Sequence, residues 1–282
     1  MQRLNTIAAV RERVAARRAA GQRIALVPTM GFLHEGHLSL IDYARQQADC
    51  VVLSVFVNPL QFGPREDLAT YPRDLDRDAK LAESRGADLL FAPAAAEMYP
   101  QERPAVTMVA PALSDRLCGR YRPGHFEGVL TVVAKLFNIV RPDVSVFGQK
   151  DFQQSVLIRR MVRDFDFAID VAVAPIIREA DGLALSSRNV YLSADERRAA
   201  TALNRALRAG QSAFASGQRN PTLILDRADA VIGAEPAVGL QYLELVEPGR
   251  LDRPEIAESG HVLAIAAFSG KTRLIDNVVL GI

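Results

Sequence analysis

The sequence predicts an α/β fold, a doubly wound parallel sheet followed by a smaller C-terminal α+β domain. Short apolar runs rich in β-branched residues, typical of strands buried on both faces, lie at residues 24–27, 51–57, 88–91, 144–147 and 169–173. Helix-length segments lie between them at residues 37–48, 74–86, 127–140 and 151–165. This alternation of strand and helix predicts parallel strands covered by helices on both faces.

The first element is expected to be an amphipathic helix. Residues 1–23 are rich in arginine, which superficially resembles a transit peptide, but they contain no serine and a strand follows at once. Ile7, Val10 and Val14 have helical spacing, so the arginines are expected to face water. Gly86 and Pro142 stand where two of the later helices should end.

The C-terminal part has different patterns. Ser193 and Glu196 have the spacing of a capping box that opens a helix to about Ala209. Pro221, behind Asn220, is expected to open another helix at its first position. Strand-like runs that predict a mainly antiparallel sheet lie at residues 240–246, 261–268 and 272–275.

The length of 282 residues suits two domains, at about 150 residues for each. Because the pattern changes after residue 176, we expect a doubly wound domain over residues 1–176. We expect residues 177–282 to form the smaller domain, which contributes a phosphate-clamp loop and a lid.

Composition excludes several classes of function. The net charge of +1 provides no general attraction to nucleic acid or to an anionic membrane. No apolar run reaches the roughly 18 residues that a membrane-spanning helix needs. Cys50 and Cys118 stand far apart, which argues against a thiolate zinc site and fits a reducing compartment.

Two of the four histidines follow the first strand of the predicted alternation. Ligands of a doubly wound sheet bind at the carboxyl ends of its strands. His34 and His37 are three residues apart, which places both imidazoles on one side of a starting helix. There they can donate hydrogen bonds to phosphate oxygens, and Gly31 and Gly36 let the backbone approach a ligand. A zinc pair would need a third ligand, and one capping histidine beside a solvated one is the structural alternative.

Amides and a lysine follow two further strands. Asn58 and Gln61 offer uncharged donors and acceptors that suit a substrate with hydroxyl groups, although they also fit ordinary turn chemistry. Lys150 is one of only four lysines against 30 arginines, and its compact charge suits a polyphosphate. Gln154 lies one helical turn after Asp151 and can reach the same place; a surface lysine beside a capping aspartate is the alternative.

The segment from Arg178 to Asn189 follows the last parallel strand. Ser186, Ser187 and Arg188 favour a phosphate clamp, and an ordinary polar loop is the alternative. For His125, the sequence leaves open whether the ring faces a ligand or only satisfies the backbone.

Five motifs that occur in order together resemble the pantoate–β-alanine ligase (pantothenate synthetase) family of the nucleotidyl-transfer superfamily. They are Pro-Thr-Met-Gly-x-Leu-His-x-Gly-His from residue 28, Phe-Val-Asn-Pro-x-Gln-Phe-Gly from 56, Gly-His-Phe-x-Gly-Val from 124, Phe-Gly-x-Lys-Asp-x-Gln-Gln from 147 and Arg-Glu-x-Asp-Gly-Leu-Ala-x-Ser-Ser-Arg-Asn from 178. The resemblance implies a Rossmann-type fold and an ATP-dependent condensation of (R)-pantoate with β-alanine. It proceeds through pantoyl adenylate and releases AMP and pyrophosphate.

The resemblance also implies that ATP is a substrate and that Mg2+ is bound mainly through its phosphates, without a metal site on the protein. It implies small-molecule substrates rather than nucleic acid or a membrane. It further implies a homodimer and a cytoplasmic location. It implies catalytic roles for His37, as proton donor, and for His34 and Lys150 on the phosphates. Gln61 and Gln154 would hold pantoate, with Gln61 also bordering β-alanine and Asn58 beside the pocket. The implied ATP-binding residues are Met30, Gly31, Phe32, Leu33, His34, Glu35, Gly36, His37, Gly148, Gln149, Lys150, Asp151, Ile177, Leu185, Ser186, Ser187 and Arg188.

Two rival functions are weighed against this one. A nucleotidyltransferase whose acceptor keeps the nucleotide would release pyrophosphate but never AMP. An RNA-binding module would need a basic face and aromatic stacking platforms, whereas the net charge is +1 and aromatic residues make up 6%.

Overall fold

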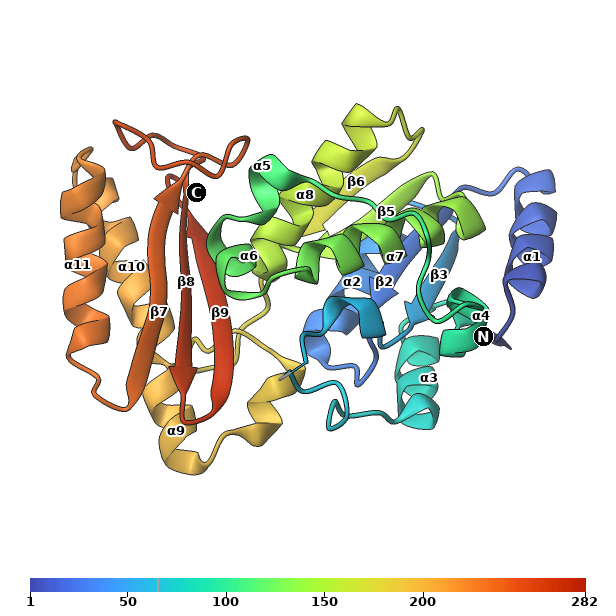
Figure 1. Ribbon diagram of the computed structural model, residues 1–282, viewed down its shortest axis with the longest axis horizontal. Helices are drawn as coiled ribbons and strands as arrows, with labels where there is room; N and C mark the ends of the chain where they lie inside the picture. The colour runs from blue at the N-terminus through green and yellow to red at the C-terminus, as the bar shows by residue number, and fades with distance from the viewer. Residues whose placement is uncertain (65) are drawn as a thin grey trace. The chain divides into compact units, whose positions relative to one another are not determined.

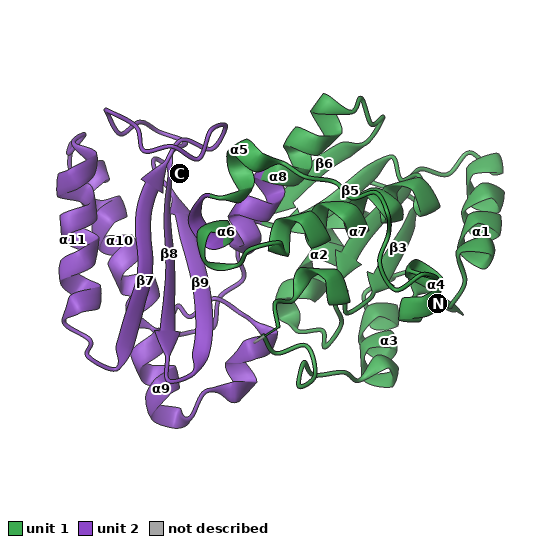
Figure 2. Ribbon diagram, in the orientation of Figure 1, with its two compact units in different colours: residues 1–115, 119–148, 157–175 green, residues 116–118, 149–156, 176–282 purple. Residues whose placement is uncertain are grey.

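The computed structural model describes residues 1–64 and 66–282 and divides into two compact units (Figures 1 and 2). Unit 1 comprises residues 1–115, 119–148 and 157–175, and unit 2 comprises residues 116–118, 149–156 and 176–282. Each unit has its own sheet, and each is described by itself.

The sheet of unit 1 is parallel and has the strand order β1-β4-β3-β2-β5-β6. Its strands in chain order are β1 (Gln2–Leu4), β2 (Ile24–Thr29), β3 (Cys50–Val55), β4 (Leu89–Phe91), β5 (Val144–Gly148) and β6 (Asp170–Ala174). The predicted α/β class and the five strands predicted for this sheet are confirmed. The edge strand β1 has no counterpart in the sequence analysis, because only Leu4 of its three residues is buried.

Helices cover this sheet as its alternating pattern predicts. The longer helices of this part of the chain are α1 (Ile7–Ala19), α2 (Glu35–Arg45), α3 (Leu75–Ser84), α7 (His125–Val140) and α8 (Phe152–Asp164), and the short ones are α4 (Ala95–Met98), α5 (Pro111–Ser114) and α6 (Leu117–Tyr121). The first residues of α6 and α8 belong to unit 2. Apolar residues of α2 and α3 share one buried cluster with Ala25 and Val27 of β2. The predicted stops are confirmed, since Gly86 follows α3 with φ of 80° and Pro142 follows α7 after a left-handed Arg141.

The order of the strands places a switch point between β2 and β5. From β2 the chain adds β3 and β4 on one side, and then β5 and β6 on the other. The neighbours are in register at Ala25 with Val144 and at Leu26 with Ser145. The connections therefore diverge beyond the carboxyl ends of β2 and β5, the place where open α/β sheets bind ligands.

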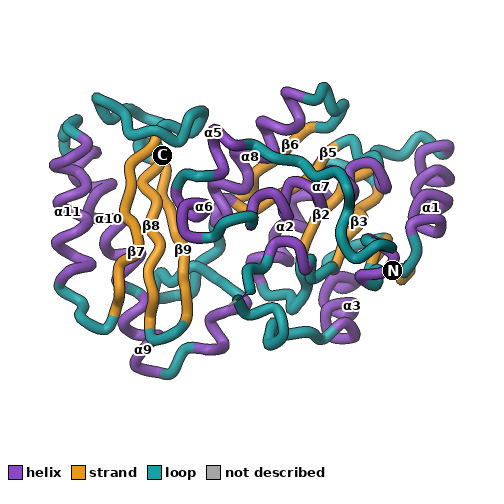
Figure 3. Tube along the Cα trace, in the orientation of Figure 1, coloured by secondary structure: helices purple, strands orange, loops and turns teal. Residues whose placement is uncertain are grey.

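Unit 2 has an antiparallel sheet of β7 (Val238–Val246), β8 (Val262–Ser269) and β9 (Thr272–Val279), which lie side by side in Figure 3. Its helices are α9 (Ala194–Ala200), α10 (Ala202–Ala215) and α11 (Pro221–Gly233). The capping box of Ser193 with Glu196 and the cap by Asn220 are confirmed. The single helix predicted to Ala209 is wrong, because Thr201 interrupts it. At this position the Thr201 amide donates to the carbonyl of Arg198, three residues back, over 3.3 Å, and the Thr201 hydroxyl donates to the same carbonyl over 2.7 Å.

Among the described residues, no helix is both long and apolar enough to cross a membrane.

Candidate active site

A buried carboxylate shapes the loop that follows β2. Asp78 of α3 accepts hydrogen bonds from the amides of Phe32 and Leu33, both over 2.7 Å. Phe32 has a left-handed φ of 49°, and Gly31 has a φ of 83°. A Cβ on Gly31 would lie 2.8 Å from Val55 and 2.9 Å from Asp78, so this position requires glycine. The two amide hydrogen bonds act to lower the pKa of Asp78, but burial outweighs them and raises it.

The two imidazoles lie together at the N-terminus of α2. Their ring centroids are 4.1 Å apart. His34 is the N-cap, and its Nδ1 accepts from the Gly36 amide over 3.1 Å; the Nδ1 of His37 accepts from the His34 amide over 3.4 Å. An accepting nitrogen carries no proton, so each neutral ring holds its proton on Nε2. The pair therefore presents two N–H donors at a helix end that favours anions.

The capping alternative for His34 is thus confirmed, and it is compatible with binding through the other ring nitrogen. For zinc, the described residues contain no group of three histidine, cysteine or acidic side chains placed to hold a metal ion.

The two predicted amides form one buried network. Asn58 is 1% exposed and Gln61 9%. Asn58 Nδ2 donates to Gln61 Oε1 over 3.1 Å and to the Gly128 carbonyl over 3.0 Å, and its Oδ1 accepts from the Tyr99 hydroxyl over 2.9 Å. Gln61 Nε2 donates to the sulfur of Met30, a weak acceptor that a substrate oxygen can replace. Asn58 therefore orients Gln61.

His125 supports the same network from the first residue of α7. Its Nδ1 donates to the Gln61 carbonyl over 2.8 Å, and its Nε2 accepts from Arg122 over 3.0 Å. Arg122 is in turn held by both carboxylate oxygens of Glu66, over 2.8 and 2.6 Å. Burial opposes ionisation of Glu66, but Arg122 outweighs it and lowers the pKa of that carboxyl. The ring of His125 thus satisfies the backbone, one of the two possibilities that the sequence leaves open for it.

Lys150 lies in unit 2, in a 3-10 turn, η2 (Gln149–Asp151), that precedes α8. Burial lowers the pKa of Lys150; the carboxylates of Asp151 and Asp276 oppose this shift, and the charge of Arg188 adds to it. A lysine with a lowered pKa in a cluster of charged groups is a candidate functional residue.

The segment after β6 is a closed hairpin rather than an open loop. The amide of Leu185 donates to the Ile177 carbonyl over 3.0 Å, and that of Glu179 to the Leu183 carbonyl over 2.8 Å. At its far end, Ser186 caps a second 3-10 turn, η3 (Ser187–Tyr191), by accepting from the Arg188 amide.

Asn189 Nδ2 donates to the carboxylate of Glu179 over 3.0 Å and to the Ala184 carbonyl over 3.2 Å. These contacts fix the backbone that carries the two serines and Arg188.

The predicted residues thus form two sets. Unit 1 holds the loop and first turn of α2 with both histidines, the two amides, and Gly148 at the end of β5. Unit 2 holds the η2 turn, Gln154 in the first turn of α8, and the hairpin residues Ile177, Leu185, Ser186, Ser187 and Arg188. Glu35 also pairs with Arg85 over 2.6 Å.

Three residues that the sequence analysis did not single out organise these sets: Asp78 in unit 1, and Asp276 and Asn277 in unit 2. A carboxylate and a carboxamide side by side between the apolar pairs Leu274–Ile275 and Val278–Val279 are the signal that could have found the last two.

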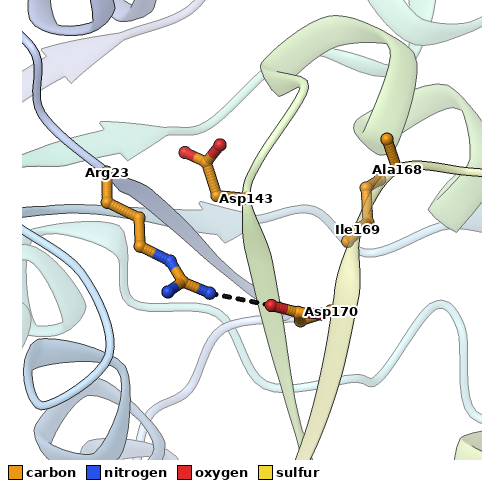
Figure 4. A pocket seen from close by; sticks show the side chains of 5 residues that line it. All are labelled: Arg23, Asp143, Ala168, Ile169 and Asp170. Carbon is orange, nitrogen blue, oxygen red and sulfur yellow. Dashed lines mark hydrogen bonds and ion pairs between the residues drawn. The ribbon is translucent and has the colours of Figure 1, made fainter.

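A hollow of about 280 Å3 lies at the opposite end of the unit 1 sheet (Figure 4). It is lined by Arg23, Asp143, Ala168, Ile169 and Asp170, and Arg23 pairs with Asp170 over 2.8 Å. These residues precede or begin β2, β5 and β6, so the hollow is at the amino ends of the strands. None of the predicted site residues lines it.

Comparison with known proteins agrees with the motifs. The family model described as pantoate-beta-alanine ligase matches residues 2–279. The pantothenate synthetase of Moorella thermoacetica is 52% identical over 280 residues, covering 99% of both chains, and that of Thermoanaerobacter sp. (strain X514) is 49% identical over 275 residues, covering 98% of this chain and 97% of the other.

Two solved structures are similar over nearly the whole chain. Pantothenate synthetase from Thermus thermophilus is 44% identical with a TM-score of 0.92, covering 99% of each chain. Pantoate-beta-alanine ligase from Francisella tularensis, solved in complex with beta-gamma ATP and beta-alanine, is 33% identical with a TM-score of 0.80 and covers 99% of this chain and 97% of that one.

Proposed function

The chain belongs to the pantoate-beta-alanine ligase family, and from this premise we propose that it joins (R)-pantoate to β-alanine at the expense of ATP. The observation that carries the proposal is the pair of imidazoles at the N-terminus of α2, directly after the central strand β2. Their Nε2 protons and the positive end of the helix dipole together suit a polyphosphate.

In the first step, an oxygen of the pantoate carboxylate attacks the α-phosphorus of ATP. The bond from that phosphorus to the bridging oxygen breaks, pyrophosphate leaves, and pantoyl adenylate remains. This step needs positioning and charge stabilisation rather than a protein nucleophile. We assign His34, His37 and Lys150 to the phosphates, with His37 as the proton donor.

In the second step, the amine of β-alanine attacks the acyl carbon and AMP departs. Gln61 and Gln154 are assigned to pantoate, with Gln61 also bordering β-alanine. The contacts of Asn58 and His125 support this role, because they hold the side-chain oxygen and the backbone carbonyl of Gln61 in place.

The remaining ATP contacts are assigned to Met30 to Glu35, Gly36, Gly148, Gln149, Asp151, Ile177, Leu185 and Ser186 to Arg188. Magnesium would enter with ATP, held mainly through phosphate oxygens. The family likeness also supports a cytoplasmic homodimer.

The test is an assay of AMP release with ATP, pantoate and β-alanine, from which each component is omitted in turn. AMP should form only in the complete mixture, and pantoate alone should support exchange of pyrophosphate into ATP. Release of pyrophosphate without AMP in the complete mixture would instead identify a nucleotidyltransferase that leaves the nucleotide on its acceptor.

A further inference from the structure

We infer that Asp276 and Asn277, neighbours on β9, are positioning residues that hold the Lys150 turn and the Arg178–Asn189 hairpin in one arrangement. The inference rests on the proposed function in one respect, that these two segments bind the phosphates of ATP. All of the residues concerned belong to unit 2.

Asn277 holds the η2 turn through hydrogen bonds from both the nitrogen and the oxygen of its side-chain amide. Its Nδ2 donates to the carbonyls of Gln149 and Lys150, over 3.0 and 3.1 Å. Its Oδ1 accepts from the Gln149 side chain over 3.2 Å. The side chain is 1% exposed, so water does not compete for these bonds. The backbone on which Lys150 stands is therefore attached to a strand 127 residues away in sequence.

Asp276 holds the hairpin through a bidentate ion pair with Arg178. Its carboxylate oxygens accept from the two terminal nitrogens of Arg178, over 2.6 and 2.9 Å, and Asp276 is 4% exposed. Arg178 also donates to the carbonyls of Gly182, over 3.1 Å, and Asn277, over 3.3 Å. One guanidinium thus joins the start of the hairpin, its turn and β9.

The alternation of a β-strand explains how one dipeptide serves two segments. Successive side chains of a strand point to opposite faces, so Asp276 and Asn277 reach different neighbours from adjacent positions. The β9 strand itself is fully paired with β8 from Thr272 to Val279, which makes it a rigid support. A lysine and two serines that must meet the same phosphates gain most from such a common support.

Asp276 has an electrostatic effect as well. Burial raises the pKa of Asp276, and Arg178 acts to keep it ionised. The charges that face Lys150 are those of Asp151, Asp276 and Arg188, and the two carboxylates favour the ammonium form. Loss of the Asp276 charge should therefore make Lys150 easier to deprotonate, which loss of the Asn277 amide should not.

The experiment compares Asn277→Ala and Asp276→Asn with Thr272→Val, a buried near-isosteric change at the start of the same strand. Hydrogen exchange is measured on the intact chain without substrates. Asn277→Ala should accelerate exchange in residues 149–151, and Asp276→Asn in residues 178–189, relative to Thr272→Val. Equal exchange in these segments for all three variants would overturn the inference.

Steady-state kinetics then test the consequence for ATP. Both variants should lose about 10- to 100-fold in kcat/KM for ATP, the loss known for groups that orient the ligands of metal sites, with KM for pantoate unchanged. The alkaline limb of the kcat/KM profile for ATP should move to lower pH in Asp276→Asn alone. Values within twofold of Thr272→Val, or an unmoved limb, would also overturn the inference.

The two proposals fail in different ways. If the proposed function is wrong, the parental chain releases no AMP in the complete mixture. The hydrogen-exchange measurement still decides whether β9 holds the two segments. If only the further inference is wrong, the parental chain is active and the variants match the control.

Discussion

Replacement of Asp78 tests how the histidine loop is built. Asp78 is 1% exposed, and its carboxylate accepts from the buried amide of Leu33 and the half-buried amide of Phe32. Each buried amide left without an acceptor costs about 1–3 kcal/mol, so Asp78→Ala should lower the free energy of unfolding by about 4 kcal/mol. Asp78→Asn keeps one acceptor and removes a buried charge, so its loss should be smaller, about 2 kcal/mol.

The functional effect should exceed what the stability loss alone would produce. The loop carries Gly31 to His37, and a misplacement near 1 Å at a reacting group can cost about 100-fold in rate. Urea unfolding gives the stability, and pantoate-dependent exchange of pyrophosphate into ATP, measured on protein shown to be folded, gives the activity. Asp76→Asn is the matched control, because Asp76 lies on the same helix but is exposed and pairs with Arg3. The reasoning would be refuted if Asp78→Asn had the same free energy of unfolding and the same rate of pyrophosphate exchange as Asp76→Asn.

Three further predictions address other parts of the molecule. Lys150→Ala should abolish pantoate-dependent exchange of pyrophosphate while circular dichroism shows an intact fold; near-normal exchange would remove Lys150 from the mechanism. Glu66→Gln should lower stability most above pH 4.5, because Arg122 lowers the folded-state pKa of Glu66; in urea unfolding the difference from the parental chain should shrink as the pH falls below 4.5, and a difference independent of pH would contradict the ion pair. Gly128→Ala should lower the melting temperature, since a Cβ there would lie 2.4 Å from the Leu60 carbonyl oxygen; an unchanged melting temperature would show that the backbone can move aside.

The sheet of unit 1 could be predicted from the sequence because its central strands are buried on both faces. Runs such as Val51 to Val55 are almost entirely apolar, a pattern that solvent-facing segments do not maintain. The β1 strand could not be predicted this way, because its pairing with Leu89 to Phe91 depends on residues more than 80 positions away. The break at Thr201 is a local change of hydrogen bonding, from the fourth to the third preceding carbonyl, which the apolar periodicity of the sequence does not reveal.

For the site, position along the chain identified His34, Asn58, Gln61 and Lys150 as candidates, since each closely follows a strand of the parallel sheet. What holds these residues could not be found in the same way. Asp78 lies 45 residues from the amide of Leu33 that it binds. Such contacts are set by tertiary packing, and they leave only a weak trace in the local sequence.

The two δ nitrogens at the start of α2 restrict which side chains could replace these histidines. Lysine and arginine would supply charge for an anion, but they have no acceptor for the amides of Gly36 and His34. Either substitution would therefore remove the side-chain hydrogen bonds that cap the first turn of α2. An imidazole can do both because it has two ring nitrogens: here one accepts from a backbone amide, and the other can carry the proton that a phosphate oxygen would accept. In this loop the same ring that caps the helix is the one proposed to bind the nucleotide, so a replacement would have to keep the acceptor nitrogen as well as the donor.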